Sequence, residues 1–322
     1  MFDLSPYARQ IALPEVGEAG QARFRAAHVL VVGAGGLGCP VLTYLATAGI
    51  GALTVMDPDR VERSNLHRQP LFAPRDIGAR KVEAAAQAIR RLAPEVRITA
   101  RAEALGASTV ATAIATADVV VDAADSFAAS YILSDACLAA GKPLISASAL
   151  GLGGYVGGFC GGAPSLRAVF PDLPEQAATC ATSGVLGPLV GMLGTAQAQM
   201  VLQLLLDCKP RVTGQMLRFD MGGLRTSGFR FDAAPEPQAP LRFVPRPRIE
   251  DLVIDLRGVE EAPEMVTPSA RRMAPQEIGQ MDLPKGRRLT LACASGLRAW
   301  RAARLLQAQG HDDLVLHAVQ AP

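Results

Sequence analysis

The sequence has little excess charge and few cysteines. Its 322 residues carry a formal net charge of only +2, which creates no large electrostatic field that would favour nucleic acid or an anionic membrane. We therefore expect neither of them as a partner. The cysteines are scattered and lack the dense spacing of a secreted disulfide framework. We expect free thiols at all six positions: Cys39, Cys137, Cys160, Cys180, Cys208 and Cys293.

The N-terminal residues lack the unbroken apolar run of a signal peptide, because Asp3, Arg9 and Gln10 interrupt it. A cytoplasmic location is expected. Residues 185–206 carry no charge and are about as long as a membrane is thick. However, this segment contains Pro188 and three glutamines, and no basic cluster flanks one end. We predict a helix of the core or of a dimer interface.

The composition is that of a compact globular protein, with 49% hydrophobic and 19% charged residues, and the length favours about two domains. The first part alternates strands with helices, which is typical of a doubly wound, Rossmann-like and mostly parallel α/β sheet. The predicted strands are 28–32, 53–56, 97–102, 118–122 and 143–149, and the predicted helices are 39–48, 79–92 and 128–140.

A change of composition divides the chain after a predicted C-terminal β-hairpin, 215–220 and 229–232. Five prolines between residues 232 and 248 predict an extended, semi-rigid linker. Beyond it, two strands and a helix predict a second, small α/β unit, at 252–256, 288–292 and 297–310. We therefore predict a first domain over 1–232, a proline-rich linker over 233–248 and a second domain over 249–322.

A glycine-rich turn follows the first predicted strand. Gly33, Gly35 and Gly38 match G-x-G-x-x-G, in which glycines permit close approach of phosphates to the backbone and to the N-terminus of the next helix. Asp57 ends the next strand, at a spacing that suits contact with a ribose hydroxyl. This motif alone does not distinguish ATP from NAD, so an NAD-dependent oxidoreductase is an alternative.

Further motifs resemble the ubiquitin-activating-like adenylyltransferases, the family of ThiF, MoeB and HesA, over about residues 5–230. The motifs are Tyr7-Ala8-Arg9-Gln10, the glycine loop, Asp57, Ser64-Asn65-Leu66-His67-Arg68-Gln69, Lys81, Asp122-Ala123-Ala124-Asp125 and Thr179-Cys180. The resemblance implies a cytoplasmic homodimer that spends ATP to adenylate the C-terminal glycine of a ubiquitin-like sulfur-carrier protein, ThiS-like or MoaD-like. Thiamine and molybdenum cofactor biosynthesis both remain open as the pathway.

The chemistry and the resemblance together assign candidate residues. A carboxylate that attacks the α-phosphate of ATP brings two anions together, so cations must screen them; Arg68 and Lys81 are the candidates. The resemblance implies that Asp57 binds the ribose, that Asp125 holds Mg²⁺ and that Arg9 reaches the site of a neighbouring subunit. It also implies nucleotide contacts from Gly33, Gly35, Gly36, Gly38 and Asn65. The family often has asparagine where this chain has Ser126.

No zinc site is predicted. Many relatives hold a structural zinc ion with two Cys-x-x-Cys pairs, and Ser165 and Ala168 stand where the first pair is expected. Only Cys208 and Cys293 follow Cys180, whereas a closed site of this kind needs four thiolates at the right spacing.

Two cysteines are candidates for covalent chemistry. Cys180 lies in a stretch of small residues and matches the family's loop cysteine; its thiol could attack an acyl adenylate, or it is an accessible bystander. Cys293 opens a segment that resembles the rhodanese active-site loop Cys-x-x-Gly-x-Arg, which ends at Arg298.

The rhodanese resemblance implies a persulfide on Cys293, stabilised by backbone N–H groups and a helix N-terminus. Residues 253–257, Val-Ile-Asp-Leu-Arg, also resemble an early strand of that fold. Its sulfur would come from a cysteine desulfurase or a small donor. Because the unit is shorter than a usual rhodanese domain, an inactive module on a noncatalytic scaffold is the alternative.

Overall fold

The structure is a computed structural model that describes residues 4–172, 184–280 and 283–319. The chain divides into two compact units. The first holds most of residues 1–236, and the second holds residues 237–322 with two short segments, 106–111 and 126–132. The predicted domain limits at residues 232 and 248 stay predictions.

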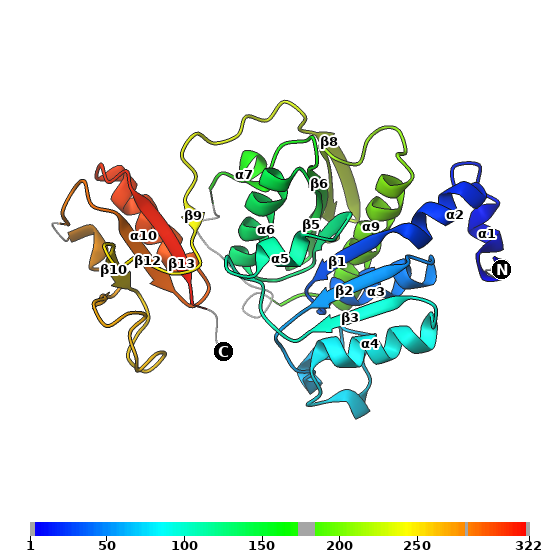
Figure 1. Cartoon of the computed structure of the whole chain (residues 1–322), viewed down its shortest axis with the longest axis horizontal. Helices are drawn as coiled ribbons and strands as arrows, with labels where there is room; N and C mark the ends of the chain where they lie inside the picture. The colour runs from blue at the N-terminus through cyan, green and yellow to red at the C-terminus, as the bar shows by residue number, and fades with distance from the viewer. Residues whose placement is uncertain (1–3, 173–183, 281–282, 320–322) are drawn as a thin grey trace. The chain divides into compact units, whose positions relative to one another are not determined.

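An eight-stranded sheet forms the centre of the first unit, in the order β3-β2-β1-β4-β5-β6-β7-β8 (Figure 1). Five strands are parallel: β1 (His28–Val32), β2 (Ala52–Met56), β3 (Arg97–Arg101), β4 (Val119–Asp122) and β5 (Pro143–Leu150). Three antiparallel strands complete the sheet: β6 (Gly153–Cys160), β7 (Gln215–Asp220) and β8 (Arg225–Arg230). The predicted fold class, a doubly wound and mostly parallel sheet with a C-terminal hairpin, is confirmed.

The helices of the first unit are placed by their apolar faces. On α4, Val82, Ala85 and Ile89 recur at helical spacing and are fully buried. The helices of the first unit are α1 (Ala8–Ile11), α2 (Gly17–Ala26), α3 (Gly38–Thr47), α4 (Lys81–Leu92), α7 (Leu166–Val169) and α9 (Gly187–Leu205). Two more helices, α5 (Val110–Ile114) and α6 (Phe127–Ala140), begin in the short segments assigned to the second unit and end in residues of the first.

Helix α9 is the uncharged segment of the sequence, and it packs against α3, β5 and β6. Leu189, Leu193 and Val201 are buried along it. Among the helices of the described residues, none is long and apolar enough to cross a membrane. The prediction of a core helix is confirmed.

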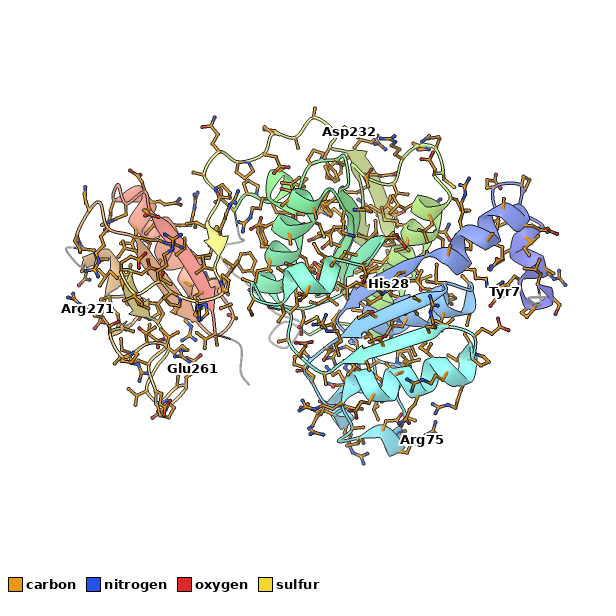
Figure 2. All side chains as sticks on the ribbon, viewed as in Figure 1. Tyr7, His28, Arg75, Asp232, Glu261 and Arg271 are labelled. Atoms are coloured by element: carbon orange, nitrogen blue, oxygen red, sulfur yellow. The ribbon has the colours of Figure 1, made fainter. Side chains whose placement is uncertain are left out.

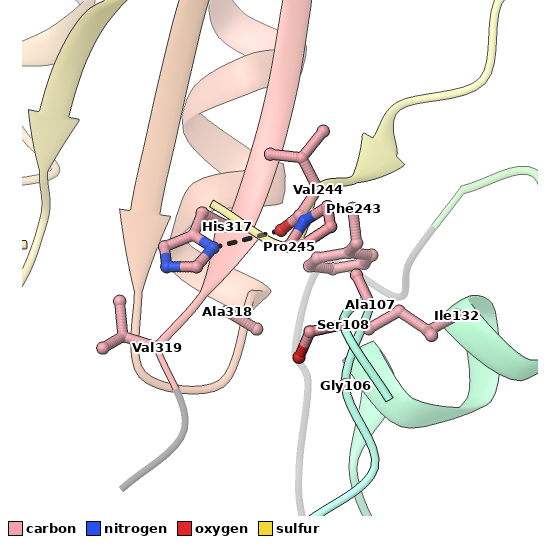
Figure 3. A pocket seen from close by; sticks show the side chains of 10 residues that line it. All are labelled: Gly106, Ala107, Ser108, Ile132, Phe243, Val244, Pro245, His317, Ala318 and Val319. Carbon is pink, nitrogen blue, oxygen red and sulfur yellow. Dashed lines mark hydrogen bonds between the residues drawn. The ribbon is translucent and has the colours of Figure 1, made fainter. Parts of the chain in front are cut away.

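The second unit has a five-stranded parallel sheet in the order β11-β10-β12-β13-β9. Its elements are β9 (Arg242–Phe243), β10 (Leu252–Asp255), β11 (Arg271–Arg272), β12 (Leu289–Cys293), α10 (Leu297–Ala308) and β13 (Leu314–Ala318). At the β9 edge, His317 Nδ1 donates to Val244 O at 3.1 Å (Figure 3), and Val244 N donates to Leu316 O at 2.8 Å. Burial lowers the pKa of His317, which favours the neutral imidazole.

Two strands of the first unit differ from the prediction. The second strand of the predicted hairpin lies earlier than 229–232, because β8 pairs with β7 from Arg225 opposite Asp220 to Arg230 opposite Gln215. Strand β6 was not predicted, because its glycines hide the alternation of a strand. Gly158 is required there, since a Cβ on it would lie 2.6 Å from Val212 O.

Candidate nucleotide-binding site

The glycine loop joins the end of β1 to the start of α3 under tight steric constraints. Gly33 has φ +100°, and a Cβ on it would lie 2.4 Å from Ala123 O, while a Cβ on Gly38 would lie 2.0 Å from Gly33 O. A Cβ on Gly36 would lie 2.9 Å from a methyl group of Val190, and Gly35 has nothing nearer than 3.7 Å. The loop is therefore fixed between the β1 and β4 ends, and it presents the α3 N-terminus, a suitable place for an anion.

Asp57 follows β2 and is tied to this loop. Its Oδ2 accepts a hydrogen bond from Ala34 N at 2.7 Å, and its Oδ1 accepts one from Asp59 N at 2.8 Å. Burial raises the pKa of the Asp57 carboxyl, and the nearby Lys81 and the two N–H donors oppose this shift. The structure thus orients the carboxylate that the sequence assigns to a ribose.

Lys81 begins α4 and is already paired. Its Nζ donates to Asp59 Oδ2 at 2.7 Å; the Lys81 side chain is 8% exposed and that of Asp59 is 61% exposed. Asp59 was missed by the sequence reasoning, although the Asp57-Pro58-Asp59 spacing was a signal for it. A phosphate that binds Lys81 must compete with this carboxylate.

Arg68 and Asn65 lie in and after a short 3₁₀ turn, η2 (Arg63–Asn65). The buried Asn65 accepts hydrogen bonds at its backbone oxygen from Arg68 N and Gln69 N, both at 3.1 Å. The Arg68 guanidinium donates to Ser64 O at 3.2 Å and to His67 Nε2 at 3.0 Å. Asn65 therefore shapes the turn, and Arg68 is held by its own segment.

The electrostatics of Cys39, in the first turn of α3, indicate that the predicted charges converge. Burial raises the pKa of the Cys39 thiol to about 12, while the positive charges of Lys81 and Arg68 lower it and that of Asp57 raises it. The contacts agree, because Asp57 accepts a hydrogen bond from Ala34 N of the glycine loop and a Cβ on Gly36 would lie 3.3 Å from Arg68 O. This is the arrangement expected around the phosphates of a nucleotide.

The residues at the β4 end fit a magnesium ion that a nucleotide also binds. Asp122 is buried and accepts from Ser146 Oγ at 2.8 Å, whereas Asp125 is exposed after the strand. Mg²⁺ typically takes one or two carboxylates together with phosphate oxygens and waters, so one exposed carboxylate is a suitable protein ligand.

Two predicted residues are not brought to the loop. Arg9 lies exposed on α1, whose neighbouring Gln10 donates to Ala48 O at 2.8 Å, at the C-terminal end of α3. The ten residues of α3 span about 15 Å, so Arg9 of the same chain lies at the end opposite the glycine loop. Cys180 lies outside the described residues.

The donor set does not fit the zinc ion that many relatives hold. At the expected first pair, Ser165 N and Ser165 Oγ each donate to Glu236 at 2.6 Å, and Ala168 N donates to Ser165 Oγ at 3.3 Å. A zinc ion needs lone pairs from all four ligands, whereas here hydrogen atoms face a carboxylate. Over the ranges that the structure describes, no group of three or more His, Cys, Asp or Glu side chains could hold a metal.

The Cys293 loop of the second unit also lies between a strand and a helix. Cys293 ends β12 and is buried, and its Sγ accepts a hydrogen bond from Ala299 N at 3.4 Å in the first turn of α10. Arg298 donates to Leu256 O at 2.9 Å and is paired with Glu261, which is labelled in Figure 2. That hydrogen bond raises the pKa of Arg298 and lowers the pKa of Glu261.

Comparison with known proteins places the first unit in a family. The model of the ThiF family matches residues 7–241. The Bos taurus protein named adenylyltransferase and sulfurtransferase MOCS3 is 46% identical over 221 residues, which are 68% of this chain and 49% of that protein. The SAMP-activating enzyme E1 of Haloferax volcanii is 42% identical over 219 residues, 67% of this chain and 81% of that protein.

The chain spans about half the length of the MOCS3 relatives that it matches. Among solved structures, E. coli MccB with MccA-N7isoASN has a TM-score of 0.65 and 19% identity, over 73% of this chain and 74% of that one. This likeness shows the fold alone. The fold, the glycine loop with its surrounding charges, and the family match over residues 7–241 agree: the chain belongs to the ThiF family.

Proposed function

We propose that this chain uses ATP to adenylate the C-terminal glycine of a ubiquitin-like sulfur-carrier protein, ThiS-like or MoaD-like. The observation that carries the proposal is that the segments of Asp57, Lys81 and Arg68 meet at the glycine loop. Asp57 accepts from Ala34 N and from Asp59 N, Asp59 pairs with Lys81, and a Cβ on Gly36 would lie 3.3 Å from Arg68 O. Two relatives, named as an adenylyltransferase and as a SAMP-activating enzyme, support this activity. A generic dinucleotide-binding site would not require both the Arg68 guanidinium and the Lys81 ammonium.

Each group has a proposed task in the transfer. The N–H groups of the loop and the α3 N-terminus bind phosphate oxygens, and Asp57 receives the ribose. The Lys81 ammonium exchanges Asp59 for a phosphate, and Arg68 neutralises charge as the carboxylate oxygen attacks the α-phosphorus and pyrophosphate leaves with the bonding electron pair. Mg²⁺, held by Asp125, would supply further neutralisation of the phosphates.

The first test is the exchange of labelled pyrophosphate into ATP, which reports reversible adenylation. Exchange is expected only when a ThiS-like or MoaD-like carrier is present, and not with the same carrier lacking its terminal glycine. The carrier that supports exchange identifies the pathway, thiamine or molybdenum cofactor biosynthesis. Lack of exchange with every carrier rules the proposal out, and binding of a nicotinamide dinucleotide without ATP would favour the oxidoreductase alternative.

The position of Arg9 supports a homodimer in which each copy completes the site of the other. A mixture of R9A and K81A subunits tests this, because one of the two sites in a mixed dimer would have both residues intact. Each variant alone should exchange pyrophosphate poorly, and the mixture should regain part of the activity. If R9A alone is as active as the unmodified protein, Arg9 has no role in the site.

We further propose that Cys293 carries the sulfur as a persulfide. Its terminal sulfur would attack the acyl carbon of the adenylate and release AMP, and a thiol that then attacks the Cys293 sulfur would free the thiocarboxylate. The N–H of Ala299 and the α10 N-terminus support a negatively charged sulfur at this position. Cys180 is the candidate for the second thiol, and a cysteine desulfurase or a small donor would load Cys293.

Weighing the carrier after incubation with ATP and a sulfur source detects replacement of oxygen by sulfur. C293A should abolish the replacement and leave pyrophosphate exchange unchanged. C208A, which removes a half-buried cysteine outside both loops, is the matched control and should change neither. If C293A still yields thiocarboxylate, the second unit is not the donor and the inactive-module alternative is correct.

A further inference from the structure

A carboxylate joins two distant segments of the first unit where relatives have a zinc ion. Ser165 N donates to Glu236 Oε1 and Ser165 Oγ donates to Glu236 Oε2, each at 2.6 Å. Both carboxylate oxygens are therefore used, and the distances are those of charge-assisted hydrogen bonds. Ser165 is 1% exposed, so water competes little on its side of the contact.

The segment that Glu236 binds is itself held firmly on α6. Leu166 N donates to Ser134 Oγ at 2.9 Å, and the buried Arg167 forms a bidentate pair with Asp135 at 2.6 and 3.0 Å. Ser165 Oγ also accepts from Ala168 N and so caps the short helix α7. Glu236 thus binds a fixed anchor, although it comes from the chain beyond β8.

Glu236 lies in the part of the sequence where the family resemblance implies the second pair of zinc ligands. The resemblance to the ThiF, MoeB and HesA family implies a first cysteine pair at Ser165 and Ala168 and a second pair in a later segment. In this chain, the residue that contacts Ser165 is Glu236, six residues after β8 ends at Arg230. It provides a carboxylate where the resemblance implies thiolates.

We propose that Ser165 and Glu236 form a metal-free clasp that replaces the structural zinc ion of the relatives. Two donors from Ser165 and two acceptor oxygens from Glu236 close the loop that zinc would close, with no ion required. The clasp also fixes the point at which the proline-rich segment leaves the first unit. This inference does not depend on the proposed enzymatic activity.

The chemistry of the clasp predicts which substitution breaks it. In Glu236→Gln, the size is kept but the negative charge is lost, and the NH₂ group that replaces one acceptor oxygen can no longer accept the hydrogen bond that the Ser165 hydroxyl donates. Hydrogen bonds to charged groups are worth enough to change an unfolding equilibrium constant roughly tenfold to a hundredfold. Ser165→Ala removes one of the two bonds and the cap of α7, and it keeps the bond from the backbone N–H.

The test combines metal analysis with stability on the full chain. Zinc in the purified protein, measured by mass spectrometry, should be far below one ion per chain, and a strong chelator should leave the thermal midpoint unchanged. E236Q should raise the unfolding constant about tenfold or more and speed hydrogen exchange of the Ser165 amide. E250Q, the same charge change at another exposed position, is the control and should do neither.

Three results would overturn the clasp. The first is stoichiometric zinc whose removal lowers the midpoint. The second is an E236Q protein indistinguishable from E250Q in stability and in exchange of the Ser165 amide. If E236Q does not fold, S165A provides the third, since a stability equal to that of the unmodified protein shows that the Ser165 hydroxyl contributes nothing.

Discussion

The glycine loop and the Cys293 loop occupy equivalent places in their two sheets but are held by different forces. Each follows a buried parallel strand, β1 or β12, and precedes a helix, α3 or α10. In the first unit, backbone atoms approach so closely at Gly33 and Gly38 that no side chain fits. In the second unit, ion pairs surround the loop. Steric constraint alone describes the first loop, whereas the second combines ion pairs with a glycine, Gly296, whose φ is +80° and where a Cβ would lie 2.5 Å from the Phe243 ring.

One buried carboxylate from each unit shows the same contrast. Asp57 is bound mainly by backbone N–H groups, and burial raises its pKa. Burial also acts on Asp255, but hydrogen bonds from the Arg257 side chain and from backbone N–H groups outweigh it and hold the pKa of Asp255 below its ordinary value. The first carboxylate is poised to accept a ligand, whereas the second already has a full set of partners.

The substitution with the largest expected effect is G38A. Its Cβ would lie 2.0 Å from the Gly33 carbonyl oxygen, which is backbone and cannot move aside without opening the loop. Pyrophosphate exchange should be abolished, with loss of folding detectable by circular dichroism. G35A is the control, because its Cβ meets nothing nearer than 3.7 Å, and it should fold normally. A folded and fully active G38A would refute the steric account.

The second largest expected effect is a loss of activity without a loss of stability, in K81A. K81A removes the cation paired with Asp59, and losing one such preorganised stabiliser should lower pyrophosphate exchange roughly a hundredfold. Stability should change little, because Asp59 is 61% exposed and can be solvated. R75A, which removes a surface cation 72% exposed, should leave exchange unchanged. Equal losses in the two variants would mean that Lys81 acts only through net charge.

D255N applies the corresponding change to the second unit. Asp255 is fully buried and bonds Arg257 at 2.8 Å, so its neutralisation leaves Arg257 without its counter-charge and should cost about 3 kcal/mol. Hydrogen exchange should accelerate across β10 and β12, while the first unit keeps its pyrophosphate exchange. D312N, at an exposed position, is the control. If D255N impairs adenylation as strongly as stability, the two units are not independent.

The smallest expected effect is a difference between the two units in how their stability depends on acid pH. The pKa of Asp255 is lowered on folding, so its contribution to stability is present above an unfolded pKa of about 3.9 and is lost as pH falls through the folded value. The pKa of Asp57 is raised, so its contribution to stability grows as pH falls. Hydrogen exchange followed from about pH 5 to about pH 2 should show β10 losing protection before β2. The reverse order would contradict these shifts.

The sequence predicted well those elements of both units that have a strong local pattern. The strand at 28–32 agrees residue for residue with β1, and the helix at 297–310 agrees closely with α10, because buried β-branched runs and helical periodicity are local signals. Strand β6 and the start of β8 were not found, since Gly153, Gly154 and the segment after Arg225 have the composition of loops. Their conformation comes from pairing with β5 and β7.

The candidate site was predicted unevenly for a similar reason. The glycine loop, Asp57, Asn65, Arg68 and Lys81 are a set of short motifs, and the structure gathers their segments. Asp59 was missed because its importance comes from a contact 22 residues away, with Lys81. Glu236 could not be anticipated either, because its partner Ser165 is 71 residues distant and only tertiary folding brings them together.

In the Lys81–Asp59 pair, the Asp59 carboxylate competes with any bound phosphate for the Lys81 ammonium. Any phosphate that takes the Lys81 ammonium displaces a carboxylate only 2.7 Å away, and a phosphate that departs is replaced at once by that carboxylate. The exchange limits how tightly an anion can be retained and leaves no bare ammonium behind when it goes. In the proposed reaction, Asp59 would therefore lower the affinity of Lys81 for a phosphate and would restore a counter-charge to the ammonium when that phosphate leaves.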